Sequence, residues 1–80
     1  MELGFYNHFK GGVYHVVGIA LHHETREELV MYYDYNTAPP FTFYAREKKN
    51  FEEEVIVNGK KVKRFQKEKY NYEKDVEYDN

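Results

Sequence analysis

The segment at residues 13–22 constrains the fold most, because hydrophobic residues fill both parities of its alternating pattern. A period of two residues predicts a β-strand whose side chains point to opposite faces of a sheet. One face would carry Val13, His15, Val17, Ile19 and Leu21, and the other Tyr14, Val16, Ala20 and His22. Gly18 interrupts the run and favours a β-bulge where the strand passes between two halves of a curled sheet. We therefore expect other strands to cover both faces of this segment.

A β-hairpin is expected immediately before this strand. Residues 5–9 form a short aromatic-rich strand, and Gly11 and Gly12 tolerate the positive φ of the tight turn that follows it. Further along the chain, the pattern predicts a third strand at 28–35, a loop with two prolines at 36–40 and another extended segment at 41–45.

The strongest local signal is the pair Asn58-Gly59, which is typical of a type I′ hairpin turn between strands at 54–57 and 60–65. Residues 44–55 also show helical spacing and helix-favouring side chains. We expect only one short helical turn there, because a long helix would consume the first strand of the hairpin.

The chain has the size and composition of one small domain. It has 80 residues, of which 41% are hydrophobic and 19% aromatic, so it can build one core but not two. We assign residues 1–65 to this domain. Residues 66–80 form a charged C-terminal tail with one aliphatic residue, Val76, in which Tyr70 and Tyr72 can still add an edge strand.

Composition also excludes several classes of protein. With 12 Lys and Arg against 14 Asp and Glu, the formal net charge of -2 gives no bulk attraction to nucleic acid. The lack of Cys removes disulfides, thiolate zinc sites and cysteine nucleophiles, and the lack of Ser disfavours a hydrolase triad. No apolar run approaches the roughly 20 residues that span a bilayer, and the first ten residues lack the apolar stretch of a signal peptide. A cytoplasmic protein with no membrane segment is therefore expected.

Several segments together carry a resemblance to a known family. They are His-Phe-Lys-Gly at 8–11, Tyr-His-Val-Val-Gly at 14–18, residues 20–32, and Arg46 followed by Phe51 and the arm at 62–65. Over residues 4–65 this order resembles a small bacterial and phage family, the domain of unknown function DUF1653. The chain departs from the usual residues of that family at Leu21, Tyr44, Glu47 and Lys63. The resemblance implies a compact SH3-like barrel with no established activity. We expect an all-β, partly open SH3-like barrel of about six strands, with one short helical turn and a charged C-terminal tail.

Tyrosines on the expected strands provide the first candidate site. The chain has nine Tyr residues, and those on strands of opposite parity cannot all be buried. We predict an exposed groove lined by Tyr6, Tyr14, Tyr32 and Tyr44 with Arg46 beside it, suited to an extended peptide or a planar ligand. The alternative is that these tyrosines complete a thin core while their hydroxyl groups reach water.

A basic stretch provides the second candidate site. Residues 60–69 carry six positive charges and one negative charge, a net charge of +5, and include Lys60, Lys61, Lys63 and Arg64. Such a surface, with aromatic residues nearby, can hold single-stranded nucleic acid. The alternative is an edge hairpin whose lysines discourage the addition of further strands.

His22 and Glu24 form a third, polar candidate site, because histidine titrates near neutral pH and a neighbouring carboxylate can orient it. The alternative is a turn in which Glu24 or Thr25 caps backbone groups. The spacing of the histidines fits no metal site, and we expect no cofactor.

A non-enzymatic binding module is the function that we favour. It would present its aromatic surface to a protein or peptide partner, since such a surface needs no convergent catalytic set. Weak nucleic-acid binding through 60–69 and an enzyme centred on His22 and Glu24 are the alternatives. A homodimer that covers part of the strand at 29–35 is also compatible with its two apolar faces.

Overall fold

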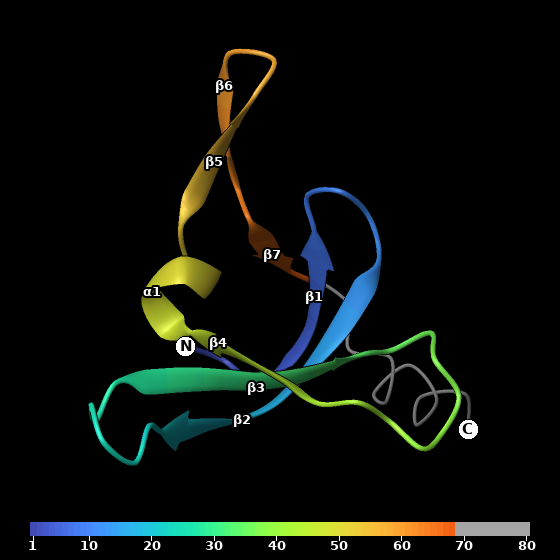
Figure 1. Cartoon of the computed structure of the whole chain (residues 1–80). Helices are drawn as coiled ribbons and strands as arrows, with labels where there is room; N and C mark the ends of the chain where they lie inside the picture. Colours follow the sequence, from blue (N-terminus) through green and yellow to red (C-terminus); the bar gives the residue numbers. More distant parts are fainter. Residues whose placement is uncertain (69–80) are drawn as a thin grey trace.

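Seven strands and one short helix form the described part of the protein, residues 1–68 of a computed structural model (Figure 1). In chain order they are β1 (Gly4–His8), β2 (Val13–Leu21), β3 (Glu28–Asp34), β4 (Tyr44–Glu47), α1 (Lys48–Phe51), β5 (Glu54–Val57), β6 (Lys60–Lys63) and β7 (Phe65–Lys67). The all-β class and the single short helical turn are thereby confirmed. The edge strand considered at Tyr70 and Tyr72 lies outside the described residues.

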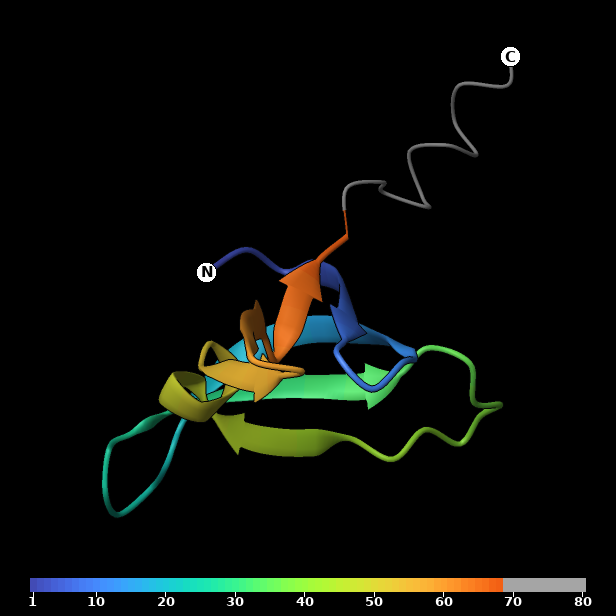
Figure 2. The ribbon, with the colours of Figure 1, turned by 90° about the horizontal axis from the view of Figure 1, so that it is seen from above.

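The strands form two antiparallel sheets. One contains β4, β3, β2, β1 and β7 in that order, and the other contains β5 and β6. Figure 2 shows β2, β3 and β4 side by side, and Figure 1 shows the β5–β6 hairpin projecting from the large sheet. Within residues 1–68 the strands do not close into a barrel.

The structure has seven strands rather than about six because the expected arm at 60–65 divides at Arg64. β6 ends at Lys63, and the next residue but one, Phe65, begins β7 beside β1. β7 pairs with β1 as far as Lys67, so this strand runs two residues past position 65, where we placed the end of the domain.

The bulge expected near Gly18 is present, and it changes the predicted assignment of faces. The register of β2 on β3 shifts between Val16 and Gly18, so that Val17 is an extra residue. One extra residue moves every later side chain to the opposite face of the sheet. Ile19 therefore lies on the same face as Val16, and the prediction that grouped Ile19 with Val13 was wrong.

β2 is covered unequally along its length. β1 pairs with β2 only as far as Val16, whose side chain is fully buried. Beyond the bulge, Val17, Ile19 and Leu21 are 42%, 39% and 56% exposed. The expectation that both faces of residues 13–22 are covered therefore fails beyond the bulge, where β1 also stops pairing with the strand.

The hydrophobic core lies on one face of the large sheet. Its buried side chains are Tyr6, Val16, Val30, Tyr32, Phe51 and Phe65. The single turn of α1 follows β4 directly and buries Phe51. The Phe51 ring stacks on Phe65 with 4.0 Å between centroids and an interplanar angle of 3°. Helix α1 therefore closes the core over the sheet with one aromatic side chain.

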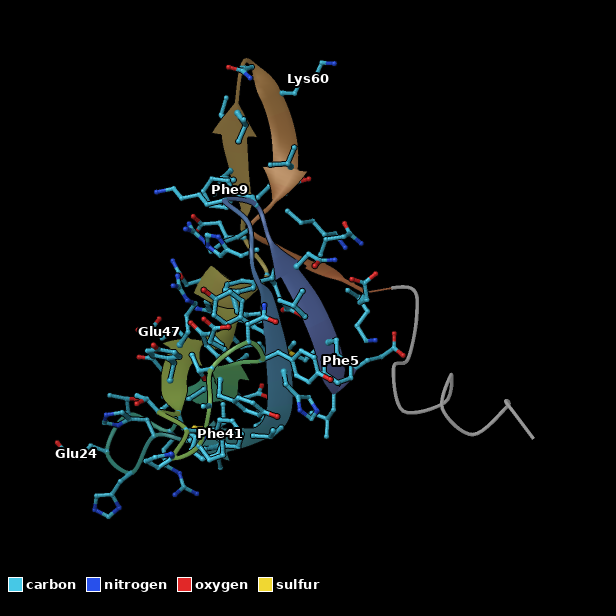
Figure 3. All side chains as sticks on the ribbon, turned by 90° about the vertical axis from the view of Figure 1, so that its right-hand side faces the viewer. Phe5, Phe9, Glu24, Phe41, Glu47 and Lys60 are labelled. Carbon is cyan, nitrogen blue, oxygen red and sulfur yellow. The ribbon has the colours of Figure 1, made fainter. Side chains whose placement is uncertain are left out.

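A second aromatic cluster lies on the opposite face. Phe5 is buried and stacks on His15 at 4.5 Å, and His15 shares a 3.0 Å hydrogen bond with the Tyr33 hydroxyl. β4 begins at Tyr44, three residues later than the extended segment predicted at 41–45. Phe41 instead lies against the Tyr33 ring, with 4.5 Å between centroids (Figure 3). Aromatic side chains thus support both faces of a thin sheet.

The β5–β6 hairpin confirms the prediction made from Asn58 and Gly59. Both residues have positive φ, 52° and 78°, as a type I′ turn requires. Val55 pairs with Val62 across the two strands.

Candidate binding groove

Three neighbouring strands bring four of the predicted groove residues together on the core face of the sheet. Tyr32 of β3 pairs with Tyr44 of β4, and Arg46 lies two residues further along β4, on the same face. The Tyr32 ring is 5.7 Å from that of Tyr14 in β2 and 5.5 Å from that of Tyr44. These four side chains, with His8 of β1 and Phe65 of β7, line a hollow of about 190 Å³, here called the Arg46 groove.

Tyr6 lies outside the Arg46 groove. Its side chain is only 7% exposed, and its hydroxyl donates a 2.6 Å hydrogen bond to the carbonyl oxygen of Glu2. Burial, followed by repulsion from the Glu2 carboxylate, raises its pKa. The alternative that tyrosines complete the core therefore describes Tyr6 and the buried Tyr32, whereas Tyr44 is 46% exposed. Tyr32 forms part of the floor of the groove, and Tyr44 forms its open rim.

Arg46 is held in a fixed orientation by three contacts. Its Nε–H donates to the Tyr32 hydroxyl at 3.1 Å, and its Nη1–H donates to Oδ1 of Asn50 at 2.5 Å. Its Cζ lies 5.4 Å from the centroid of the Phe65 ring, within cation–π range. Asn50 lies in α1, so the short helix positions the guanidinium as well as closing the core.

No carboxylate neutralises Arg46 within residues 1–68. The ion pairs there are Lys48–Glu28 and Arg64–Glu53. Every buried side-chain nitrogen or oxygen in this part of the chain has a hydrogen-bond partner. Because Nη2 of Arg46 makes no hydrogen bond to these residues, it must be open to solvent. The groove therefore presents a half-buried cation with unused donors.

His8 adds a neutral hydrogen-bonding group to the groove. Its Nδ1 accepts a 3.1 Å hydrogen bond from the backbone N–H of Lys10, which places the ring proton on Nε2. Desolvation lowers the pKa of His8, and the nearby cations Arg46, Arg64 and Lys10 lower it further. His8 is thus an uncharged donor in a positively charged environment at neutral pH.

Tyr14 keeps its hydroxyl proton. Burial raises its pKa, and Asp34 raises it further, although Arg46 acts in the opposite direction. The hydroxyl can therefore both donate and accept a hydrogen bond at the wall of the groove.

Sequence reasoning did not include His8 and Phe65 in this site. They face each other across the β1–β7 pairing, which is absent from the expected strands. The signal that could have indicated them is parity, since both lie in register with Tyr6 and Tyr14 on one face of the sheet.

His22 and Glu24 lie in the exposed turn between β2 and β3 (Figure 3). Nδ1 of His22 accepts hydrogen bonds from the backbone N–H groups of Glu24 and Thr25, at 3.1 and 3.2 Å. Oγ1 of Thr25 accepts another from the N–H of Glu27 at 3.2 Å. Capping by Thr25 is what we gave as the alternative to chemistry, whereas capping by the His22 side chain was not expected. Among residues 1–68, His22 has no hydrogen bond or ion pair with a carboxylate.

The basic stretch is divided between solvent and structure. Lys60, Lys61 and Lys63 are exposed on the projecting hairpin, where Figure 3 shows Lys60 near its tip. Lys63 pairs in register with Glu54, so a carboxylate lies beside it. Arg64 instead donates to Oε1 of Glu53 and to the backbone oxygen of Asn50, both at 3.1 Å. Its guanidinium thus fastens the hairpin to α1.

Other hollows lie on the described part of the chain. One of about 290 Å³ also combines aromatic and cationic side chains, although it has no arginine; its lining includes Tyr6, Phe51, Phe65, Lys63 and Lys67. A hollow of about 260 Å³ is lined by charged side chains from the β2–β3 turn, β3, β4 and α1, and one of about 330 Å³ lies between the hairpin and the end of β1. In residues 1–68 no cluster of three or more His, Cys, Asp or Glu is arranged to hold a metal ion. None of the helical structure described is long and apolar enough to span a membrane.

The fold and the groove define a small all-β domain with an aromatic, cationic surface hollow. The family model described as "Protein of unknown function (DUF1653)" matches residues 4–67, and the chain belongs to this family. A crystal structure of a DUF1653 protein from Bordetella bronchiseptica is similar, with a TM-score of 0.76 and 26% sequence identity. The similarity covers 85% of this chain and 87% of that one. No curated protein matches the chain.

Proposed function

We propose that this domain is a non-enzymatic, SH3-like binding module that holds an extended peptide segment of a protein partner in the Arg46 groove. The observation that carries the proposal is the exposed ring of Tyr44 beside half-buried Tyr14, above a floor of buried Tyr32 and Phe65. The floor is already desolvated, whereas the rim still has apolar area to bury.

Aromatic side chains suit this task physically. They supply a large contact area with few rotatable bonds, so little conformational entropy is lost when they bind a partner. Tyrosine and arginine are also the residue types that most often dominate the binding energy of interfaces. A peptide laid across Tyr44 and Tyr14 would bury rings that folding leaves open to water, and could hydrogen-bond to the Tyr14 hydroxyl, which keeps its proton.

A displayed library of random peptides, selected against the immobilised 80-residue protein, tests the proposal. We expect enriched peptides to bind the wild type and to lose about tenfold or more in affinity with Tyr44→Ala. Tyr35→Ala is the matched control, because Tyr35 is 43% exposed and packs on Phe5 on the other face of the sheet. Peptides that bind both variants equally, or a selection that enriches nothing, would refute the proposal.

Nucleic-acid binding is the second candidate, supported by the three exposed lysines of β6 on a projecting hairpin. If it is correct, affinity for a labelled single-stranded oligonucleotide falls steeply with salt and with the double change Lys60→Glu and Lys61→Glu. Weak binding that neither salt nor the double variant alters would dismiss it.

The enzyme hypothesis has less support, because His22 caps a turn. The homodimer stays a prediction that sedimentation velocity would check. The cytoplasmic location stays a prediction that cell fractionation would check.

A further inference from the structure

We infer that the Arg46 groove recognises a carboxylate of the bound peptide, with Arg46 as its cationic anchor. This inference rests on the proposed peptide-binding function and adds the chemical class of the recognised group. It is carried by the geometry of the guanidinium, its lack of a counter-charge and the nature of its neighbours.

The guanidinium is oriented in advance and still has donors available. Arginine has five N–H donors, and the contacts to Tyr32 and Asn50 use one on Nε and one on Nη1. The remaining donors lie on Nη1 and on Nη2, the two nitrogens that a carboxylate can engage together. A planar carboxylate accepts two parallel N–H bonds from such a pair, which makes this a strong and specific contact.

In the described part of the chain, Arg46 lacks the direct ion pair that a half-buried cation normally has, although the Asp34 carboxylate lies close enough to Tyr14 to raise its pKa. Within residues 1–68, Arg46 has no carboxylate within 4.0 Å, although Arg64, the other arginine near α1, is paired with Glu53 at 3.1 Å. The charges that act on His8 are all positive. A ligand carboxylate would therefore compensate Arg46 without displacing an internal partner.

A single negative charge fits better than a phosphate group. Phosphate is usually bound by clusters of arginines because it carries nearly two charges. Among residues 1–68, Arg46 is the one cation that lines the groove, and its polar neighbours include the neutral His8 and the Tyr14 hydroxyl. One guanidinium and neutral donors complement one carboxylate.

Three peptides test the inference and identify the source of the carboxylate. Acetyl-Gly-Phe has a free C-terminal carboxylate, acetyl-Glu-Phe-amide has only a side-chain carboxylate, and acetyl-Gln-Phe-amide has neither. Each is titrated into the ¹⁵N-labelled 80-residue protein, and backbone amide shifts at Tyr44 and Arg46 are followed by NMR. We expect at least one acidic peptide to bind roughly tenfold or more tightly than the neutral one, as a charge-assisted hydrogen bond allows.

Variants of the protein connect this preference to Arg46. Arg46→Gln is expected to remove the preference, and Arg46→Lys to retain part of it, because lysine keeps the charge but not the planar fork. Lys49→Gln is the matched control, since it removes one exposed positive charge from α1 outside the groove. In the wild type alone, raising the salt concentration should weaken the acidic peptides and leave the neutral one unchanged. This last measurement decides the question even if Arg46→Gln does not fold.

Three results would overturn the inference. They are equal affinity of all three peptides, a preference that survives in folded Arg46→Gln, and no shift at the groove with any peptide. Equal affinity at the groove would leave the peptide-binding proposal intact and remove only the carboxylate. Failure of the proposed function itself would instead appear as a peptide selection that does not depend on Tyr44.

Discussion

Replacing Phe51 with alanine is expected to lower the free energy of unfolding by about 4 kcal/mol. The Phe51 side chain is 1% exposed and is the only one that α1 buries. Burying a phenylalanine removes about 150–250 Å² from water, which at about 25 cal/mol per Å² is worth roughly 4 to 6 kcal/mol as an upper estimate. Measured substitutions of this kind cost about 3–5 kcal/mol. A domain of 80 residues has a total stability of only about 4–12 kcal/mol.

Urea denaturation followed by circular dichroism measures this loss. Phe51→Leu keeps most of the buried volume, so we expect it to cost only about 1 to 1.5 kcal/mol and to remain folded. Phe43→Ala is the matched control, since Phe43 is 53% exposed and makes an edge contact with Tyr33, and its loss should be about 1 kcal/mol. A loss below about 1 kcal/mol for Phe51→Ala, or equal losses at positions 51 and 43, would refute the role given to α1.

Two further substitutions test the turn and the groove. Gly59→Ala should lower the free energy of unfolding by about 1–2 kcal/mol, measured by thermal or urea unfolding, because Gly59 has a φ of 78°. A Cβ at position 59 would meet nothing within 4 Å, so only backbone strain acts. Gly18→Ala is the control: φ is not positive there, so it should cost nothing, and equal costs at the two positions would contradict the prediction. Desolvation and nearby cations lower the pKa of His8, so below about pH 6.5 the unfolded chain binds a proton that the folded protein resists. The wild type should therefore lose stability relative to His8→Asn as the pH falls from 7.5 to 5, and a difference in unfolding free energy that stays constant with pH would argue against it.

The hairpins and the bulge could be predicted because local chemistry specifies them. Positive φ at Asn58 and Gly59 follows from residues that tolerate it. The strand β7 could not be predicted, because its pairing depends on Arg64 turning the chain back toward β1. That turn is held by contacts with Glu53 and Asn50, which are distant in sequence.

The site was predicted in part for a similar reason. Tyr32, Tyr44 and Arg46 meet because strands β3 and β4 pair in a register that the alternation already suggests. Tyr6 has the same residue type and the same face, yet it lies in the core because Phe51 covers it at 5.2 Å. Which tyrosine stays open thus depends on where a four-residue helix lies, and parity cannot show that.

Val17 is the extra residue of the β-bulge in β2. Because of this extra residue, the later side chains of β2 lie on the opposite face from the one that simple alternation predicts, and Ile19 pairs with Val30 on the core side. Deleting Val17 would remove the bulge and leave Gly18 opposite Met31 and Ile19 opposite Val30, so both residues would keep their faces. What the extra residue supplies is a local bend and a stronger twist, so the deletion should straighten β2 at the point where β1 stops pairing with it.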